Sequence, residues 1–102
     1  MAVVQITKDN FEKEVMESGK TVLLDFFAGW CGPCRIMAPA VDKVAEENPD
    51  IFVGKVDVDD QRELAAKYNI MSIPTLVVIR NGETVTQSTG VKTKNKILSM
   101  LK

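Results

Sequence analysis

The chain has 102 residues, of which 45% are hydrophobic and 26% charged, and its formal net charge is −1. This length and composition fit one domain, residues 1–102, with a core that needs no disulfide to hold it together. The charge excludes the strongly basic surface of a nucleic-acid or anionic-lipid binder, and the apolar runs are too short to span a bilayer. Histidine is absent, which excludes Cys-His and Ser-His nucleophile pairs.

A short strand and a helix are predicted before residue 20. Residues 2–6 are rich in β-prone side chains. Asp9 is expected to cap the helix that follows, because its carboxylate can accept hydrogen bonds from the first free N–H groups. Ser18-Gly19 is expected to end that helix, since glycine readily takes the left-handed conformation of a C-terminal cap.

Residues 21–28 form a longer apolar run that contains one charged residue, Asp25. Apolar side chains on both faces are typical of a central strand covered by helices. From Cys34 onward the spacing predicts a helix with an apolar stripe, and a kink is expected at Pro39. The stripe comprises Ile36, Met37, Ala40, Val41, Val44 and Ala45.

After a break at residues 48–50, a second strand and a short helix are predicted. Residues 51–58 favour the strand, which contains Lys55. Asp59 or Asp60 is expected to cap the helix, again through its carboxylate.

A β-hairpin and a helix are predicted to end the chain. Residues 74–80 and 84–88 favour strands, and Asn81-Gly82 between them is a turn sequence that pairs strands antiparallel. Thr93 is expected to cap the last helix. The predicted order is β-α-β-α-β-α-β-β-α, in which the crossovers imply parallel pairing early and the hairpin antiparallel pairing late. We therefore expect an α/β fold with a mixed sheet and helices on both faces.

The only two cysteines lie between the central strand and its helix, in Trp30-Cys31-Gly32-Pro33-Cys34. A purely structural disulfide is one interpretation, but a ring this small would stabilise the fold by only about 2 kcal/mol. A zinc site is a second, but the four usual ligands are not available unless two chains share one metal. A dithiol at a helix N-terminus, which favours the thiolate, makes a redox centre the favoured interpretation.

The two cysteines are expected to differ in role. Cys31 precedes the helix and should be the exposed thiolate that attacks a substrate disulfide. Cys34 lies in the first turn and should be more buried, where it resolves the mixed disulfide. Asp25 is expected to have a raised pKa and to accept the Cys34 proton, unless it turns to water or is paired structurally. Lys55 would be such a partner if the two strands are neighbours.

Taken together, these residues resemble the thioredoxin family over essentially the whole chain. The resemblance is carried by the Trp30–Cys34 motif, Asp25, Lys55 within residues 54–59, Ile73-Pro74-Thr75, Asn81-Gly82 and Gly90. It implies the thioredoxin fold, a mixed and mostly five-stranded sheet flanked by about four helices on both faces. It also implies a general protein-disulfide reductase, a dithiol–disulfide electron carrier.

The resemblance assigns roles that the residues alone leave open. Most X-Pro bonds are trans, yet Pro74 would be a cis-proline packed against a Cys31–Cys34 disulfide, with the Ile73 backbone free to pair with an extended substrate. Asp25 would be the buried acid–base group, with Lys55 near it. An apolar docking surface around Cys31 would comprise Trp30, Gly32, Pro33, Ile73, Pro74, Gly90 and Val91.

The resemblance also implies partners. A flavin-containing thioredoxin reductase would supply electrons, so the flavin would belong to that enzyme and this chain would bind no cofactor and no metal. Disulfide-containing proteins would be the substrates. We expect a cytoplasmic monomer without nucleic-acid or membrane partners, because residues 1–6 show no export leader. A CxxC pair in that compartment is more often catalytic or metal-binding than structural.

Four positions depart from the commonest family pattern. Phe27 stands where many members have tryptophan, Gly29 where a larger polar residue is frequent, and Met71-Ser72 where members vary. Gly29 and Met71 border the docking surface, so these departures bear on the choice of partner more than on the chemistry.

Two other functions compete with a reductase. One is an oxidant or isomerase of secreted proteins, which the missing export leader and the Gly32-Pro33 dipeptide, without histidine, disfavour. The other is a binding module whose docking is gated by the redox state of Cys31 and Cys34.

Overall fold

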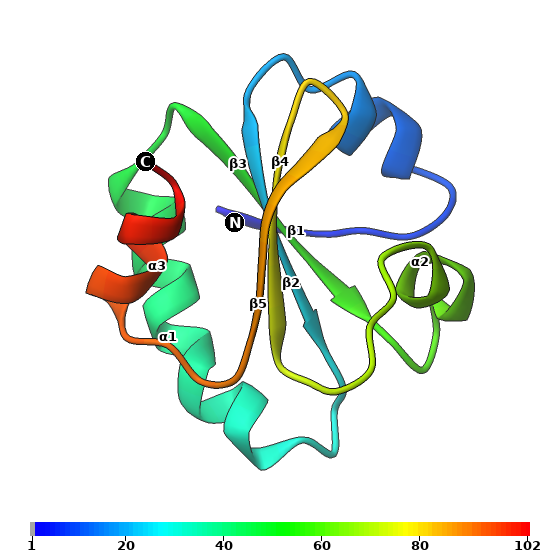
Figure 1. The fold of residues 1–102 in the computed structure, drawn as a ribbon, viewed down its shortest axis with the longest axis vertical. Helices are drawn as coiled ribbons and strands as arrows, with labels where there is room; N and C mark the ends of the chain where they lie inside the picture. The colour runs from blue at the N-terminus through cyan, green and yellow to red at the C-terminus, as the bar shows by residue number, and fades with distance from the viewer. Residues whose placement is uncertain (1) are drawn as a thin grey trace.

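Five strands form one mixed sheet in the order β1-β3-β2-β4-β5 in the computed structural model, which describes residues 2–102 (Figure 1). β1 pairs with β3 and β3 with β2 in parallel, whereas β2–β4 and β4–β5 are antiparallel. The strands are β1 (Val3–Gln5), β2 (Thr21–Phe27), β3 (Ile51–Asp57), β4 (Thr75–Arg80) and β5 (Glu83–Thr89). The predicted element order and the mixed sheet are confirmed.

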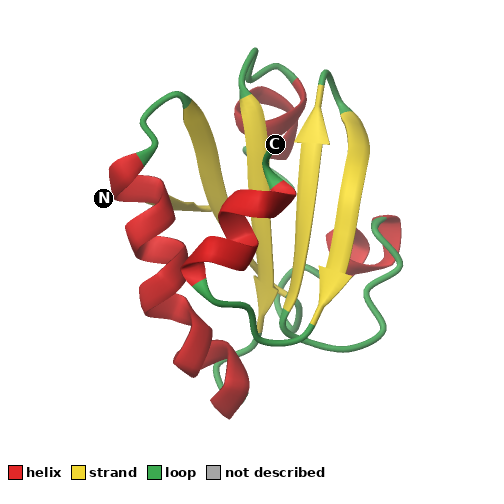
Figure 2. Ribbon diagram, turned by 60° about the vertical axis from the view of Figure 1, so that its left-hand side comes forward, coloured by secondary structure: helices red, strands yellow, loops and turns green. Residues whose placement is uncertain are grey.

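Helices cover both faces of the sheet, and the alternation of side chains along each strand assigns a core to each face. Figure 2 shows α1 and α3 together on one face and the other two helical segments behind it. The helices are η1 (Glu12–Met16), α1 (Gly32–Glu47), α2 (Arg62–Lys67) and α3 (Lys94–Met100). Leu23 of β2 packs among residues of α1 and α3, whereas Leu24 packs among residues of η1 and α2. Asp25 therefore shares the α1 face with Leu23, the face over which Cys34 lies.

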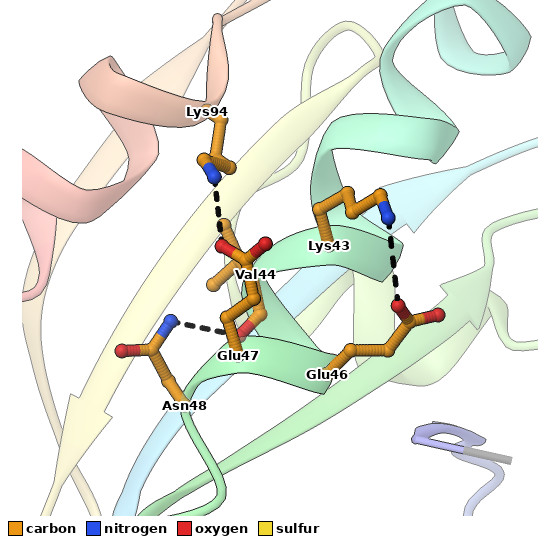
Figure 3. Close-up of polar contacts among 6 residues, drawn as sticks. All are labelled: Lys43, Val44, Glu46, Glu47, Asn48 and Lys94. Atoms are coloured by element: carbon orange, nitrogen blue, oxygen red, sulfur yellow. Dashed lines mark hydrogen bonds and ion pairs between the residues drawn. The ribbon is translucent and has the colours of Figure 1, made fainter.

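Exposed side chains at the C-terminal end of α1 make polar contacts with α3 and within the helix itself (Figure 3). Lys94 Nζ of α3 lies 2.7 Å from Glu47 Oε1, and Lys43 lies 3.9 Å from Glu46 on the same helix. Asn48 Nδ2 donates to the Val44 carbonyl at 2.9 Å and so closes the last turn. Exposed pairs of this kind contribute little free energy, so the buried stripe of α1 is what holds it on the sheet. Its buried members are Cys34, Met37, Val41, Val44 and Ala45.

The prediction of the apolar stripe of α1 is wrong at one residue. Ile36 is 73% exposed, because Cys34 and Met37 occupy the buried face of the first turns and leave Ile36 on the outer side. Pro39 lies inside α1 as predicted.

Two predicted helix caps are also wrong. Asp9 does not cap η1, because the turn begins earlier: the Thr7 carbonyl accepts from the N–H groups of Asn10 and Phe11, which leaves Asp9 inside the turn. Neither Asp59 nor Asp60 caps α2. Gln61 occupies the N-cap position and makes no side-chain cap there.

One predicted helix end is confirmed and another in part. Thr93 Oγ1 accepts from the Lys96 N–H at 3.2 Å and caps α3. Gly19 has the expected left-handed conformation, with φ +73°, but η1 ends at Met16 with Glu17 as its C-cap, so the glycine follows the cap. No helix within residues 2–102 has both the length and the hydropathy to cross a membrane.

Candidate functional site

Cys31 and Cys34 form a disulfide at the N-terminus of α1, with their Cα atoms 5.3 Å apart. Cys31 is the N-cap residue, and its Sγ accepts a hydrogen bond from the Cys34 N–H at 3.2 Å. Pro33 lies in the first turn, where its missing N–H costs nothing because that position has no intrahelical acceptor. The sulfur of Cys31 therefore faces the unpaired N–H groups and the positive end of the helix dipole, as the sequence predicts.

The predicted difference in exposure between the two cysteines is wrong. Cys31 is 3% exposed and Cys34 4%. Both cysteines cluster with Ala28, and Phe27, Val58 and Ile73 pack against this small apolar cluster. A difference in role must therefore come from what each sulfur faces.

Asp25 lies opposite Lys55 in the parallel β2–β3 register, so the predicted neighbourhood of these two residues is confirmed. Asp25 is 6% exposed, and its Oδ1 has no hydrogen-bond partner within residues 2–102. Burial raises the pKa of Asp25 to about 7 from an ordinary 3.8; Lys55 opposes this rise and Asp42 adds to it. The Lys55 ammonium also lies 5.8 Å from the centre of the Phe27 ring.

A cleft of about 230 Å³ joins Asp25 to the second cysteine but not to the first. Its polar walls are Asp25, Lys55 and Arg35, and Cys34 lines it as well. Residues with small side chains, Ala28, Gly29 and Ala38, leave the space open next to Phe27. The arrangement places a carboxyl group with a pKa near neutrality in the same cleft as Cys34, which suits general acid–base chemistry at that cysteine.

The expected docking residues lie around the disulfide. The Ile73-Pro74 bond is cis, Pro74 is buried, and no backbone hydrogen bond of Ile73 is found within residues 2–102. The Gly90 N–H donates to the Pro74 carbonyl at 2.9 Å, so the Gly90-Val91 segment lies beside Pro74.

A shallow groove of about 400 Å³ runs along the other side of the site, between Trp30 and Met71. Both of these side chains are exposed, as are Pro33 and Val91, whereas Gly32 is half-buried. The remaining lining residues of the groove are Val58, Ile70, Ser72 and Ile73. Met71 thus lies beside Trp30 and Ile73, two of the residues expected to dock substrates.

Two polar contacts at the site were not predicted. The Trp30 indole N–H donates to Asp59 at 2.8 Å, and Arg35 Nη1 donates to the Gly29 carbonyl at 2.7 Å. Trp30 and Asp59 are far apart in sequence. The only sequence signal for their contact is that Asp59 directly follows a predicted strand. Arg35 follows Cys34 immediately and is one of the residues that line the Asp25 cleft.

Comparison with known proteins decides the family. The sequence profile named Thioredoxin matches residues 2–102, which is nearly the whole chain. The chain belongs to the thioredoxin family. Together with the Cys31–Cys34 disulfide, this makes it a dithiol–disulfide oxidoreductase of the thioredoxin fold.

Curated relatives support the assignment over most of their length. The chain is 44% identical over 102 residues to thioredoxin of Pyropia yezoensis, covering 99% of this chain and 95% of that protein. It is 42% identical to thioredoxin of Bacillus subtilis strain 168, covering 99% and 96%. It is 40% identical over 101 residues to thioredoxin of Mycobacterium tuberculosis strain H37Rv, covering 98% and 87%. Within residues 2–102 the structure holds no group of three or more histidine, cysteine, aspartate or glutamate side chains arranged to bind a metal ion.

Proposed function

We propose that this thioredoxin-family chain reduces disulfides in other proteins, with Cys31 as the attacking thiolate and Cys34 as the resolving thiol. One observation carries the assignment of roles: the two sulfurs, equally buried, face different groups. Cys31 Sγ accepts the Cys34 N–H at the start of α1, where a thiolate is stabilised. Cys34 lines the cleft that contains the Asp25 carboxyl group.

The exchange proceeds in two steps that transfer two electrons to the substrate. The Cys31 thiolate attacks one sulfur of a substrate disulfide, forms a mixed disulfide and releases the first substrate thiolate. Asp25 then accepts the proton of Cys34, and the Cys34 thiolate attacks Cys31 Sγ. This closes the Cys31–Cys34 disulfide and releases the second substrate thiolate. The Lys55 charge keeps the ionised form of Asp25 accessible near neutral pH.

Substrates dock beside the sulfur of Cys31 in an extended conformation. The Ile73 backbone is available for strand pairing, and Pro74 forms the wall behind it. Trp30, Gly32 and Pro33 supply the apolar contacts on one side. Gly90 and Val91 supply them on the other, since Gly90 is bonded to Pro74.

A thioredoxin reductase is the proposed source of electrons, and its flavin remains with that partner. A reductase of protein disulfides works where thiols are kept reduced, so we place the chain in the cytoplasm. It is proposed to act as a monomer, because the cysteines, the acid–base group and the docking residues all come from one chain.

Insulin reduction driven by dithiothreitol tests the proposal. The wild-type protein should accelerate the reduction, and Cys31→Ser should return it to the rate of dithiothreitol alone. Cys34→Ser removes the same cross-link but keeps the proposed nucleophile, so it should lose turnover yet still form a mixed disulfide with insulin, which Cys31→Ser should not. A wild-type protein without activity, or a fully active Cys31→Ser variant, contradicts the proposal.

The direction of electron flow needs a separate measurement. The protein is equilibrated against a series of glutathione ratios, and the oxidised fraction is determined by thiol alkylation. We expect the Cys31–Cys34 disulfide to persist at ratios that fully reduce a strong oxidant, because no histidine stands between the cysteines to stabilise the reduced form. Reduction as easy as that of the strong oxidants would instead favour the oxidase or isomerase function.

A further inference from the structure

Met37 connects the Gly90-Val91 segment to α1. The Lys92 N–H donates to Met37 Sδ at 3.4 Å, across 55 positions of sequence. Met37 is 1% exposed and lies one turn after Cys34 on the buried face of α1. A thioether sulfur is a weak acceptor, so its contact with a backbone N–H needs close packing to persist. The α1 core provides that packing.

The other hydrogen bonds of the loop formed by residues 90–93 do not reach α1. The Gly90 N–H donates to Pro74 of the segment before β4. Lys92 Nζ donates to the carbonyls of Thr89 at 2.8 Å and Gly90 at 3.2 Å, which closes the loop on itself. Among the hydrogen bonds of Gly90–Thr93 within residues 2–102, the one to Met37 alone reaches α1.

Residues 90–93 belong to no helix or strand, so contacts of the loop set its position. Gly90 has φ +104°, a conformation that glycine leaves at small cost. Its position relative to the disulfide therefore depends on its two anchors, Pro74 on one side and Met37 on the other. The second anchor lies on the helix that carries both cysteines.

We propose that Met37 is a positioning residue, whose sulfur holds the Gly90-Val91 docking loop at a set distance from the Cys31–Cys34 disulfide by accepting the Lys92 N–H. The inference rests on the proposed function, in which Gly90 and Val91 contact the substrate. Leucine would fill nearly the same volume in the core but offers no acceptor. The Met37→Leu variant therefore separates the packing of this side chain from its hydrogen bond.

Amide hydrogen exchange measured by NMR tests the bond. The N–H groups of Val91 and Thr93 have no acceptor within residues 2–102, so in the wild type the Lys92 amide should exchange more slowly than both. Met37→Leu should speed Lys92 exchange by roughly 2- to 10-fold, the equivalent of one net hydrogen bond. Met100→Leu is the matched control, because Met100 packs against the same core cluster, and it should leave Lys92 unchanged.

Steady-state insulin reduction tests the positioning role. Met37→Leu should raise the apparent KM by roughly 2- to 5-fold. Without this hydrogen bond the loop is less ordered, and binding of the substrate must then supply part of the free energy that orders it. The kcat value and the Cys31–Cys34 reduction potential should stay as in the wild type, a pattern that a general loss of stability would not produce. Met100→Leu should keep the wild-type KM.

Each outcome decides a separate point. If the Lys92 amide of the wild type exchanges as fast as those of Val91 and Thr93, its hydrogen bond to Met37 does not form. This result decides the point even if Met37→Leu fails to fold. Faster Lys92 exchange with an unchanged KM overturns the positioning role. A wild-type protein that does not reduce insulin contradicts the proposed function, while the exchange data still decide whether the bond exists.

Discussion

Among residues 2–102, Asp25 has the pKa that is shifted furthest from its ordinary value. Burial in β2 raises the pKa of this carboxyl group to about 7, with Lys55 acting against the shift and Asp42 reinforcing it. Near neutral pH the group is then present in both protonation states in comparable amounts. A residue in this condition can accept the proton of Cys34 and return it to solvent, which an ordinary carboxylate with a pKa near 3.8 does poorly.

The raised pKa of Asp25 predicts how stability depends on pH. The folded protein keeps this proton up to about pH 7, whereas the unfolded chain releases it near 3.8. The contribution of Asp25 to stability is therefore full below pH 4 and falls as the pH rises to 7, by about 4 kcal/mol in total. Urea unfolding of wild type and Asp25→Asn across this range should show the difference.

The Asp25→Asn variant should lack this loss and become the more stable protein at pH 8. Asp50→Asn is the matched control, since Asp50 is exposed and its removal should leave the pH dependence of the wild type. Parallel curves for wild type and Asp25→Asn would show that Asp25 does not have the raised pKa.

Removal of the Asp25 carboxylate is also expected to slow one step of the reaction more than the other. Asp25→Asn should slow resolution of the mixed disulfide by about 100-fold, the usual contribution of a positioned general base. Attack by Cys31 should change much less, because that sulfur lies outside the Asp25 cleft. Single-turnover kinetics separates the two steps, and equal slowing of both would argue against this role for Asp25.

At the scale of the elements, the packing around β3 leaves no room for a side chain at Gly54. A Cβ atom there would lie 2.6 Å from Ile6 Cγ1 and 3.1 Å from Leu24 Cδ2, and both of those side chains are fully buried. Gly54→Ala should therefore destabilise the protein by ~1–3 kcal/mol through overpacking.

The matched control for this substitution is Gly29→Ala. A Cβ atom at Gly29 would meet nothing within 4 Å, so this variant should have nearly wild-type stability. Urea unfolding at one pH compares the two variants. A Gly54→Ala variant as stable as Gly29→Ala would show that the side chains of Ile6 and Leu24 move aside without cost.

The helix caps show which element-scale features can be predicted from sequence. Thr93 caps α3 through a residue three positions on, so local sequence contains the whole interaction. Asp59 was expected to act in the same way, but its carboxylate accepts from the Trp30 indole across 29 positions of sequence. Local patterns cannot reveal such a partner, and the same holds for Arg35 and the Gly29 carbonyl, which depend on the bend between β2 and α1.

At the scale of the whole molecule, strand order decides what the site contains. The sequence predicts that Lys55 can reach Asp25 only if β2 and β3 are neighbours, and the order β1-β3-β2-β4-β5 makes them so. Element order, the mixed sheet and the Cys31–Cys34 pair are all predictable, because periodicity, turn residues and spacing are local. Equal burial of the two cysteines and the contact between Met37 and Lys92 depend on tertiary packing, which local patterns do not contain.

Trapping of mixed disulfides tests the central claim, that equally buried cysteines have different roles. The Cys34→Ser and Cys31→Ser variants are reduced, mixed with insulin or another disulfide-containing protein, and the adducts are mapped by mass spectrometry. Cys34→Ser should accumulate stable mixed disulfides through Cys31, because the resolving thiol is missing, while Cys31→Ser should accumulate very few. Equal trapping through Cys34 in the Cys31→Ser variant would contradict the assignment of Cys31 as the nucleophile and Cys34 as the resolving thiol.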